Sequence, residues 1–234
     1  MSRLALLVLI AIVAFGGLAA YRWTERHPEH VPWAPLALAH PVGRFTPLKL
    51  ERLRTDFAAC RALLDEANIA YRALPPVHAN ETCGYADGVR FTADEGIGYS
   101  PAVAASCVVA AGLRLWEREV VEPAAMRHFG RGVTGITTFG TYACRRIGSG
   151  SRGRFSEHAR ANAIDIAAFT LVGGAQVSIA ADWNGDAAKA AFLSEVRDGA
   201  CRIFGTTLSP DYNAAHHDHL HLDQAPRGGI TVCS

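Results

Sequence analysis

The chain has 234 residues, of which 50% are hydrophobic and 19% are charged, so it can bury one core of ordinary size and carry a short appendage. This composition excludes wholesale disorder and collagen-like or coiled-coil architectures. The formal net charge is +1, from 23 basic and 22 acidic residues, and the basic residues form no long block, so nucleic acid is not an expected partner.

The first expected element is a membrane-targeting helix. Residues 4–20 are uncharged and apolar, and this run is close to the shortest that crosses the roughly 30 Å hydrocarbon core. It is either a cleaved signal peptide or an uncleaved anchor over residues 1–21. We favour the anchor, because a strict Ala-x-Ala cleavage site is missing and Tyr21 and Trp23 would lie at the interface. The arginines after the run outnumber the one before it, which argues weakly against export.

Cysteine usage favours export. Six cysteines follow the apolar run, without any C-x-x-C spacing, at positions 60, 83, 107, 144, 201 and 233. An export signal and an even number of cysteines predict disulfides in an oxidising compartment. We therefore expect the protein on the periplasmic side of the cytoplasmic membrane, either anchored there or secreted. Cys60 with Cys83 is the simplest pairing among the possible ones, because these residues flank one short connection.

A proline-rich stalk and a single folded domain are expected next. Residues 22–47 contain five prolines and predict an extended stalk, which can lie against the domain over residues 48–234. The domain begins with apolar residues at helical spacing, which predict an amphipathic helix over 48–68. Alternating segments around 89–99 predict a hairpin, and Pro101 is expected to open a helix to about residue 120.

The second half of the chain is richer in predicted strands. The expected elements are one or two strands over 133–144, strands over 163–170 and 176–181, a helix over 186–204 capped near Asn184 or Asp186, and a closing strand over 219–223. Helices come early and strands late, without β-α-β alternation. The predicted fold class is therefore α+β, with a central, mainly antiparallel sheet, flanking helices and stabilising disulfides.

Histidines are concentrated near the end of the chain. Four of the ten lie in residues 216–221. If this segment is a strand, His219, His221 and Asp223 share one face, while the leucines between them enter the core. Two imidazoles would then face one cleft.

An acidic residue inside an apolar strand indicates a partner for these histidines. Asp165 follows His158 by seven positions and has isoleucines on both sides, so burying it is costly unless it is paired or binds a metal. It could instead be a core residue paired with Arg145 or Arg154, and a lone His-x-His pattern also occurs by chance. Because a catalytic zinc needs about three His or carboxylate ligands and an open position, we favour a metal site formed by His158, Asp165 and one downstream histidine.

These segments carry a family resemblance. SEHARANAID is similar to the S-x-H-x-x-G-x-A-x-D motif of zinc D,D-peptidases, which share a fold with lysostaphin-type enzymes and the hedgehog N-terminal domain, and HHDHLH resembles their second motif. The nearer resemblance is to the bacterial extensin-like C-terminal domain family, through TYACR, RFSEHA, DIAAF and PDYNAAHHDHLHLD. It covers about Trp33 to Cys233. One departure is Ala161, which occupies the position of the motif's glycine.

The resemblance implies roles for five residues. His158, Asp165 and His221 would bind one Zn²⁺ ion, which lowers the pKa of its bound water and polarises the scissile carbonyl. His219 would be an unligated catalytic histidine that stabilises the oxyanion or moves a proton, and His216 would help to orient the others.

The resemblance also implies a substrate. In D,D-peptidases an arginine before the first ligand holds the substrate carboxylate, and Arg145 is the candidate here, with Ser156 as a second substrate-binding residue. The expected function is a zinc-dependent D,D-carboxypeptidase or endopeptidase that acts on peptidoglycan stem peptides and contacts the cytoplasmic membrane through its N-terminal segment. The alternative is a non-catalytic wall-binding or structural domain that retains the metal.

Overall fold

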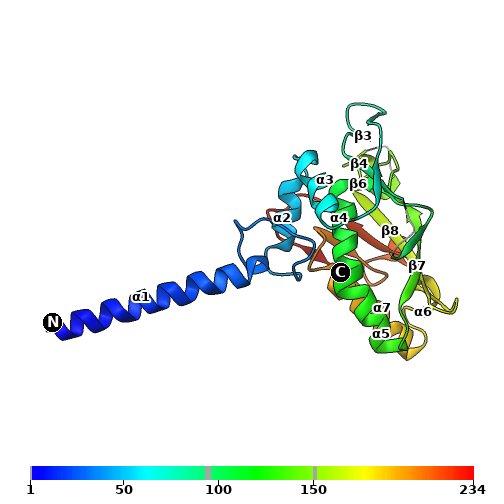
Figure 1. Cartoon of the computed structure of the whole chain (residues 1–234). Coiled ribbons are helices and arrows are strands. Elements are labelled where there is room, and N and C mark those ends of the chain that lie inside the picture. The colour runs from blue at the N-terminus through cyan, green and yellow to red at the C-terminus, as the bar shows by residue number, and fades with distance from the viewer. Residues whose placement is uncertain (1, 93–95, 150–151) are drawn as a thin grey trace.

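The computed structural model describes residues 2–92, 96–149 and 152–234 and consists of one long helix and a mixed α+β domain (Figure 1). The N-terminal helix α1 (Arg3–Arg26) projects away from the domain and buries none of its residues. It is long and apolar enough to cross a membrane, a property that a signal sequence shares.

The proline-rich segment after α1 is folded against the domain rather than extended. It contains a 3-10 turn at Pro28–His30, and Val31 and Leu38 are buried. Lys49 Nζ donates a hydrogen bond to the carbonyl of Pro28 at 2.6 Å. The prolines prevent regular structure in this segment, but its apolar side chains still complete the edge of the core.

The expected helix over 48–68 is two helices, α2 (Thr46–Leu53) and α3 (Phe57–Glu66). The break lies at Asp56, whose side chain accepts a hydrogen bond from the Ala59 N–H at 2.9 Å and caps α3. Both helices bury their apolar faces against the domain. The apolar periodicity therefore continues through the break and does not reveal it.

The expected hairpin over 89–99 is wrong, because its two halves enter different sheets. β4 (Gly88–Phe91) lies between β1 (Tyr71–Ala73) and β6 (Ala104–Ser106) in a small antiparallel sheet. β5 (Gly98–Ser100) instead pairs in parallel with β7 (Val133–Gly140) in the main sheet. The alternation correctly indicated strands but contains no information about their partners. Residues 93–95, within this segment, lie outside the described residues.

The second helix begins later than expected and continues further. α4 (Cys107–Trp116) is capped by Ser106 rather than opened by Pro101, and a π-helical turn over Glu117–Val121 leads into α5 (Glu122–Phe129). Every residue of α4 except Arg114 is buried. A helix that is apolar on all sides belongs in the centre of the core.

The main sheet confirms the predicted α+β class and its mainly antiparallel pairing. Its order is β12-β10-β11-β8-β7-β5, with β9 also paired to β8; only the β5–β7 and β10–β12 pairs are parallel. The remaining elements are β2 (Val77–His78), β3 (Gly84–Tyr85), β8 (Ala163–Leu171), β9 (Gln176–Ser178), α6 (Ile179–Asp182), α7 (Ala187–Ala200), β10 (Thr206–Leu208), β11 (Leu220–Asp223) and β12 (Val232–Cys233). The α7 helix is capped by Asp186, one of the two expected residues. On the core face of β8, Phe169 packs against Trp116 and Phe192.

Disulfide formation is confirmed, but the expected Cys60–Cys83 pair is wrong. The pairs are Cys60–Cys107, Cys83–Cys144 and Cys201–Cys233. They join α3 to α4, the residue before β3 to the segment after β7, and the end of α7 to β12. Each bridge connects elements that are distant in sequence, which spacing along the chain does not show.

Candidate metal centre

Three different elements bring the expected ligands together. His158 lies in the 3-10 turn Glu157–Arg160, Asp165 is the third residue of β8, and His221 is the second residue of β11. The antiparallel register of β8 and β11 places His221 directly opposite Asp165. Cross-strand partners on one face of a sheet have adjacent side chains, so the backbone pairing itself positions two of the three groups.

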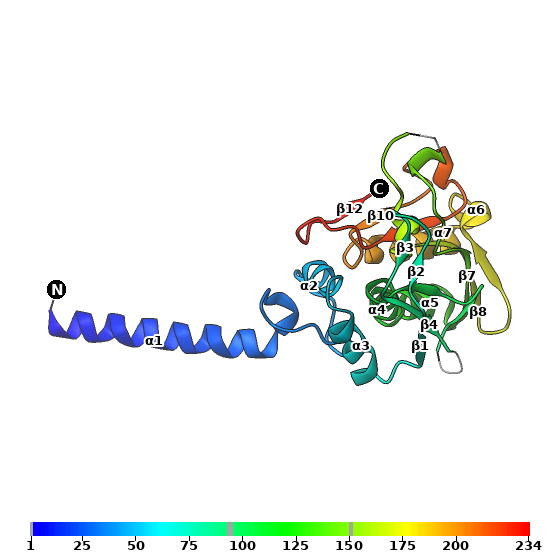
Figure 2. The same ribbon diagram turned by 90° about the horizontal axis from the view of Figure 1, so that it is seen from above.

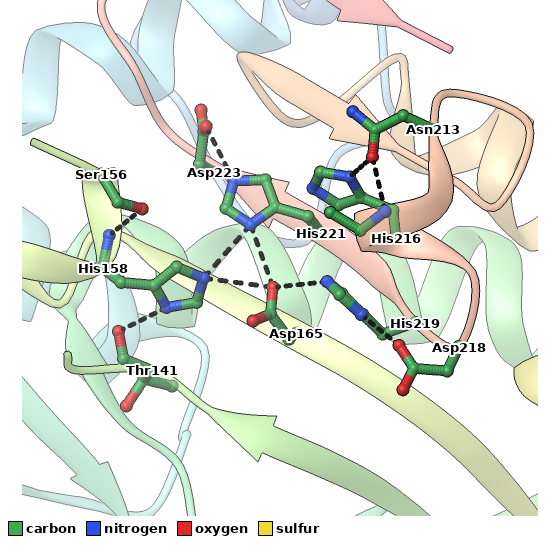
Figure 3. Close-up of polar contacts among 11 residues, drawn as sticks. Thr141, Ser156, His158, Asp165, Asn213, His216, Asp218, His219, His221 and Asp223 are labelled. Atoms are coloured by element: carbon green, nitrogen blue, oxygen red, sulfur yellow. Dashed lines mark hydrogen bonds and ion pairs between the residues drawn. The ribbon is translucent and has the colours of Figure 1, made fainter. Parts of the chain in front are cut away.

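The three ligand atoms form a nearly equilateral triangle (Figure 3). His158 Nε2 lies 3.1 Å from Asp165 Oδ1 and 3.2 Å from His221 Nδ1, and the latter two atoms are 2.9 Å apart. Adjacent ligands of a tetrahedral zinc, with bonds of about 2.0–2.1 Å, stand about 3.3 Å apart. The spacing therefore fits a metal site to within a few tenths of an ångström, and all three residues are buried.

Hydrogen bonds behind the ligands orient both imidazoles. His158 Nδ1 donates to the carbonyl of Thr141 at 3.1 Å, and His221 Nε2 donates to Asp223 Oδ2 at 3.1 Å. These bonds direct Nε2 of His158 and Nδ1 of His221 toward the centre of the triangle (Figure 3). Support of this kind fixes the tautomer and the ring orientation of histidine ligands in metal sites.

A tight turn places His158 at the start of β8. Ser156 Oγ accepts a hydrogen bond from the His158 N–H at 3.3 Å and caps the 3-10 turn. The turn ends at Ala161, whose φ of 52° lies in the left-handed region. Glycine adopts this conformation without strain, whereas alanine adopts it at some cost. The substitution leaves the turn in place, and the Ala161 carbonyl accepts from the Ser106 N–H at 2.8 Å.

The centre holds opposite charges in a buried environment. Burial raises the pKa of Asp165, but hydrogen bonds from His158 and His221 outweigh it and hold this pKa well below its usual range. Burial lowers the pKa of His221, but its hydrogen bonds to Asp165 and Asp223 raise it to about 9. Without a metal, His221 is therefore protonated at neutral pH and donates from both ring nitrogens.

Asp165 has no arginine partner among the described residues, so the alternative of a pairing with Arg145 or Arg154 does not hold. Its Oδ1 atom contacts only imidazoles, including His219 Nε2 at 3.5 Å. His219 Nδ1 lies 2.8 Å from Asp218 Oδ1 and donates to it, which directs Nε2 toward the centre (Figure 3). His219 precedes β11 rather than belonging to it, but it still reaches the ligand group.

His216 lies farther from the ligand atoms than His219. Its ring centroid is 5.1 Å from that of His219 and 6.0 Å from that of His221, and its Nδ1 atom is 2.9 Å from Asn213 Oδ1. Burial and the neighbouring His219 and His221 side chains lower the pKa of His216 to about 4. His216 is therefore neutral at physiological pH, and it is not one of the three residues of the triangle.

The two expected substrate-binding residues differ in placement. Arg145 is exposed, and its positive charge is one of the smaller causes of the low pKa of His216, after burial and the neighbouring histidines. Ser156 is buried, and its hydroxyl caps the turn that carries His158. The position of Ser156 fits a local structural role better than direct substrate contact.

Two exposed aromatic side chains beside the centre were not anticipated from the sequence. Phe139 is 59% exposed and meets His219 edge-on, and Tyr212, which is 50% exposed, does the same with His216. An exposed aromatic residue has no special spacing in the sequence. The carbonyl of Thr141 likewise leaves no signal, because any residue can supply a carbonyl. A cavity of about 1010 Å³ lies elsewhere, between α3, α4 and residues 37–39.

Comparison with known proteins gives one match. The family described as extensin-like protein C-terminus matches residues 58–234, which is more than half of the chain. No curated protein matches the chain, and no solved structure does. The description of the family names no reaction, so a function has to be argued from the site.

Proposed function

The chain belongs to the extensin-like protein C-terminus family, and we propose that it is a zinc-dependent peptidase acting on the stem peptides of peptidoglycan. The observation that carries the proposal is the buried triangle of His158, Asp165 and His221, with both imidazoles oriented inward. His219, which is not part of the triangle, lies 3.5 Å from Asp165 Oδ1. Three ligands beside an additional acid–base group are characteristic of hydrolytic zinc sites.

The donor set suits zinc. Two imidazole nitrogens and one carboxylate are ligands that zinc prefers in catalytic sites, where a fourth position is left for water or substrate. The low pKa of Asp165 keeps this carboxylate ionised and ready to bind a cation. When bound, zinc supplies Lewis-acid polarisation of a substrate carbonyl and makes water a better nucleophile near neutral pH.

In the proposed reaction, His219 transfers a proton from the attacking water to the leaving amine. Its Nδ1–H donates to Asp218, so Nε2 carries the lone pair that faces the centre. This nitrogen accepts the proton that the attacking water loses and then delivers it to the leaving amine. Asp218 stabilises the imidazolium formed between these steps, as a carboxylate behind a catalytic histidine does.

The surroundings suit a peptide with a free carboxylate. Arg145 can bind such a group with paired hydrogen bonds, because its side chain is exposed. The three disulfides are typical of an oxidising compartment, and α1 is suited to export or anchoring. Together they favour a polymer substrate outside the cytoplasm, and we place the domain on the periplasmic side of the cytoplasmic membrane.

The test is a digestion with defined products. Purified, zinc-loaded protein is incubated with peptidoglycan and with a synthetic stem peptide ending in two D-alanines, and released fragments are identified by mass spectrometry. We expect His219→Ala to lower the rate by roughly 10²–10⁴-fold while bound zinc is retained. The matched control is His78→Ala, since His78 is exposed in β2.

The same experiment identifies the alternative. If the zinc-loaded protein releases nothing but still binds peptidoglycan, and His219→Ala leaves this binding unchanged, the peptidase proposal is wrong. The domain is then a wall-binding protein that keeps its metal for structural reasons.

A further inference from the structure

The connection between α1 and the domain is folded and contains no flexible linker among the described residues. The His27 N–H donates to the carbonyl of Trp23 at 2.9 Å and closes the helix. The chain is hydrogen-bonded to α2 from the next residue on, because the buried Lys49 donates to the carbonyl of Pro28 and Arg52 donates to that of Pro32 at 2.5 Å. The helix therefore joins the domain through a folded junction rather than a flexible linker.

Backbone packing makes this junction rigid. The Phe45 N–H donates to the carbonyl of Glu29 at 3.5 Å, and a Cβ atom at Gly43 would lie only 2.4 Å from that carbonyl oxygen. The Arg44 N–H donates to His30 Nδ1 at 3.2 Å. These contacts hold residues 28–32 against the domain, so the segment that directly follows α1 is fixed in place.

The length of α1 places the domain close to the bilayer surface. The apolar run ends at residue 20, and Arg26, six residues later, lies about 9 Å further along the helix axis. One headgroup layer is about 5–7 Å thick. A membrane-spanning α1 would therefore deliver His27 to the outer edge of the headgroups and hold the adjoining surface of the domain against them.

That surface combines basic and apolar side chains. A groove of about 350 Å³ between the junction and the turn before β12 is lined in part by His30, Arg44 and Arg202, whose side chains are exposed. Trp33 is 77% exposed and Ile230, in that turn, is 71% exposed. Figure 2 shows the junction, α2 and the red turn before β12 on the side of the domain that faces α1.

We propose that this membrane-facing surface (His30, Trp33, Arg44, Arg202 and Ile230) docks on the bilayer and binds the phosphate groups of anionic phospholipids. Arginines near a membrane surface attract anionic lipids, and Trp and Ile side chains insert at the interface. The rigid junction holds the groove over the headgroups, so little orientational freedom is lost on docking. The domain is then held at one height and orientation above the membrane.

The experiment uses the full chain in lipid nanodiscs. Discs of phosphatidylcholine alone are compared with discs containing 30% phosphatidylglycerol, each with brominated lipids that quench nearby tryptophans. The fluorescence of the Trp33→Phe variant is subtracted from that of the wild type, which leaves the quenching of Trp33 alone. Trp23, which lies in α1, reports whether α1 is inserted in the bilayer. We expect strong quenching of Trp33 with phosphatidylglycerol, weakened by salt at 0.5 M.

Charge variants test the arginines. Arg44→Gln with Arg202→Gln should weaken docking by about fivefold for each arginine removed, and quenching of Trp33 should fall accordingly. The matched control replaces Arg72 and Arg90, two exposed arginines paired across β1 and β4, by glutamine and should change nothing. Unfolding temperatures confirm that each variant is folded.

Three results would overturn the proposal. The first is an unquenched Trp33 in both kinds of disc. The second is equal quenching in both, unaffected by the double arginine variant, which would indicate apolar contact without lipid selectivity. The third is a mature protein that lacks residues 1–20 and that mass spectrometry finds in the soluble fraction and not with the membrane. None of these results depends on the metal or on peptidase activity.

Discussion

Asp223→Asn tests whether the hydrogen bond behind His221 supports metal binding. Asp223 is 5% exposed and accepts from His221 Nε2 at 3.1 Å. Asparagine has the same size and can still accept this bond, but it lacks the charge. Loss of such support typically lowers metal affinity 10–100-fold, or about 1.4–2.7 kcal/mol.

The size of this effect should depend on pH. Zinc must displace the proton that His221 holds with a pKa of about 9, and Asp223 helps to hold that proton. At pH 7 the substitution therefore has two opposing effects: His221 holds the competing proton less tightly, and His221 is also a weaker ligand for zinc. At pH 9.5 the proton is largely gone and only the weaker ligand remains. We expect a loss near tenfold at pH 7 and a larger loss at pH 9.5.

Competition with a chromophoric zinc chelator at both pH values measures these affinities. The control is Asp211→Asn, which removes a carboxylate that accepts from Trp183 Nε1 at 2.9 Å on another part of the domain. Asp223 also accepts from the Ala225 N–H, so thermal unfolding of the metal-free variants separates lost stability from lost affinity. Equal zinc affinity of wild type and variant at both pH values would refute the role of Asp223, and a wild type that binds no zinc would refute the metal centre.

Four further outcomes are expected. At pH 7 zinc binding should release about one proton from His221, which calorimetry in buffers of different ionisation enthalpy measures. Because folding raises the pKa of His221 from 6.5 to about 9, protonated His221 stabilises the metal-free protein fully below pH 6.5, and this stabilisation is lost as the pH rises through 9. A constant free energy of unfolding between pH 6.5 and 9 would contradict the assignment. Ala161→Val should lower the free energy of unfolding in urea by about 2 kcal/mol or more, because a β-branched residue is strained at a φ of 52°. Ala161→Gly should change this free energy by no more than about 1 kcal/mol, and equal effects of the two substitutions would exclude backbone strain. Replacing Cys201 and Cys233, 32 residues apart, by serine should lower the free energy of unfolding by about 4 kcal/mol, and a loss under about 1 kcal/mol would show that this bridge does not constrain the unfolded chain. Arg145→Gln should raise KM roughly tenfold for substrates with a free carboxylate and leave kcat unchanged; an equal effect on amidated substrates would contradict carboxylate binding.

Two of the three candidate ligands, Asp165 and His221, were accessible to sequence reasoning because they lie on strands. Alternation along 219–223 placed His221 opposite to the buried leucines, and Asp165 was conspicuous as an acid among isoleucines. Both inferences need only the two-residue period of a strand. The structure adds the β8–β11 register, which determines that His221 and Asp165 are direct neighbours.

The failures have a common physical cause, which is that local patterns do not specify distant partners. The alternation over 89–99 fits two strands, but their partners are β1, β6 and β7, far along the chain. Cys60 pairs with Cys107, 47 residues away, because α3 packs against α4 in the core. The break at Asp56 was missed for a different reason, since a capping residue and an exposed helical aspartate look alike in sequence.

Rigid and variable parts of the centre come from different kinds of structure. Asp165 and His221 are fixed by strand pairing, and a shift of one residue in the β8–β11 register would turn one of them to the opposite face and destroy the triangle. His219 and Arg145 instead lie on connecting segments. The Cys83–Cys144 disulfide holds the segment that carries Arg145 to the domain. The positions of Asp165 and His221 are therefore set by the sheet, while the groups proposed to contact substrate lie on loops, where substitutions can change specificity without disturbing these two residues.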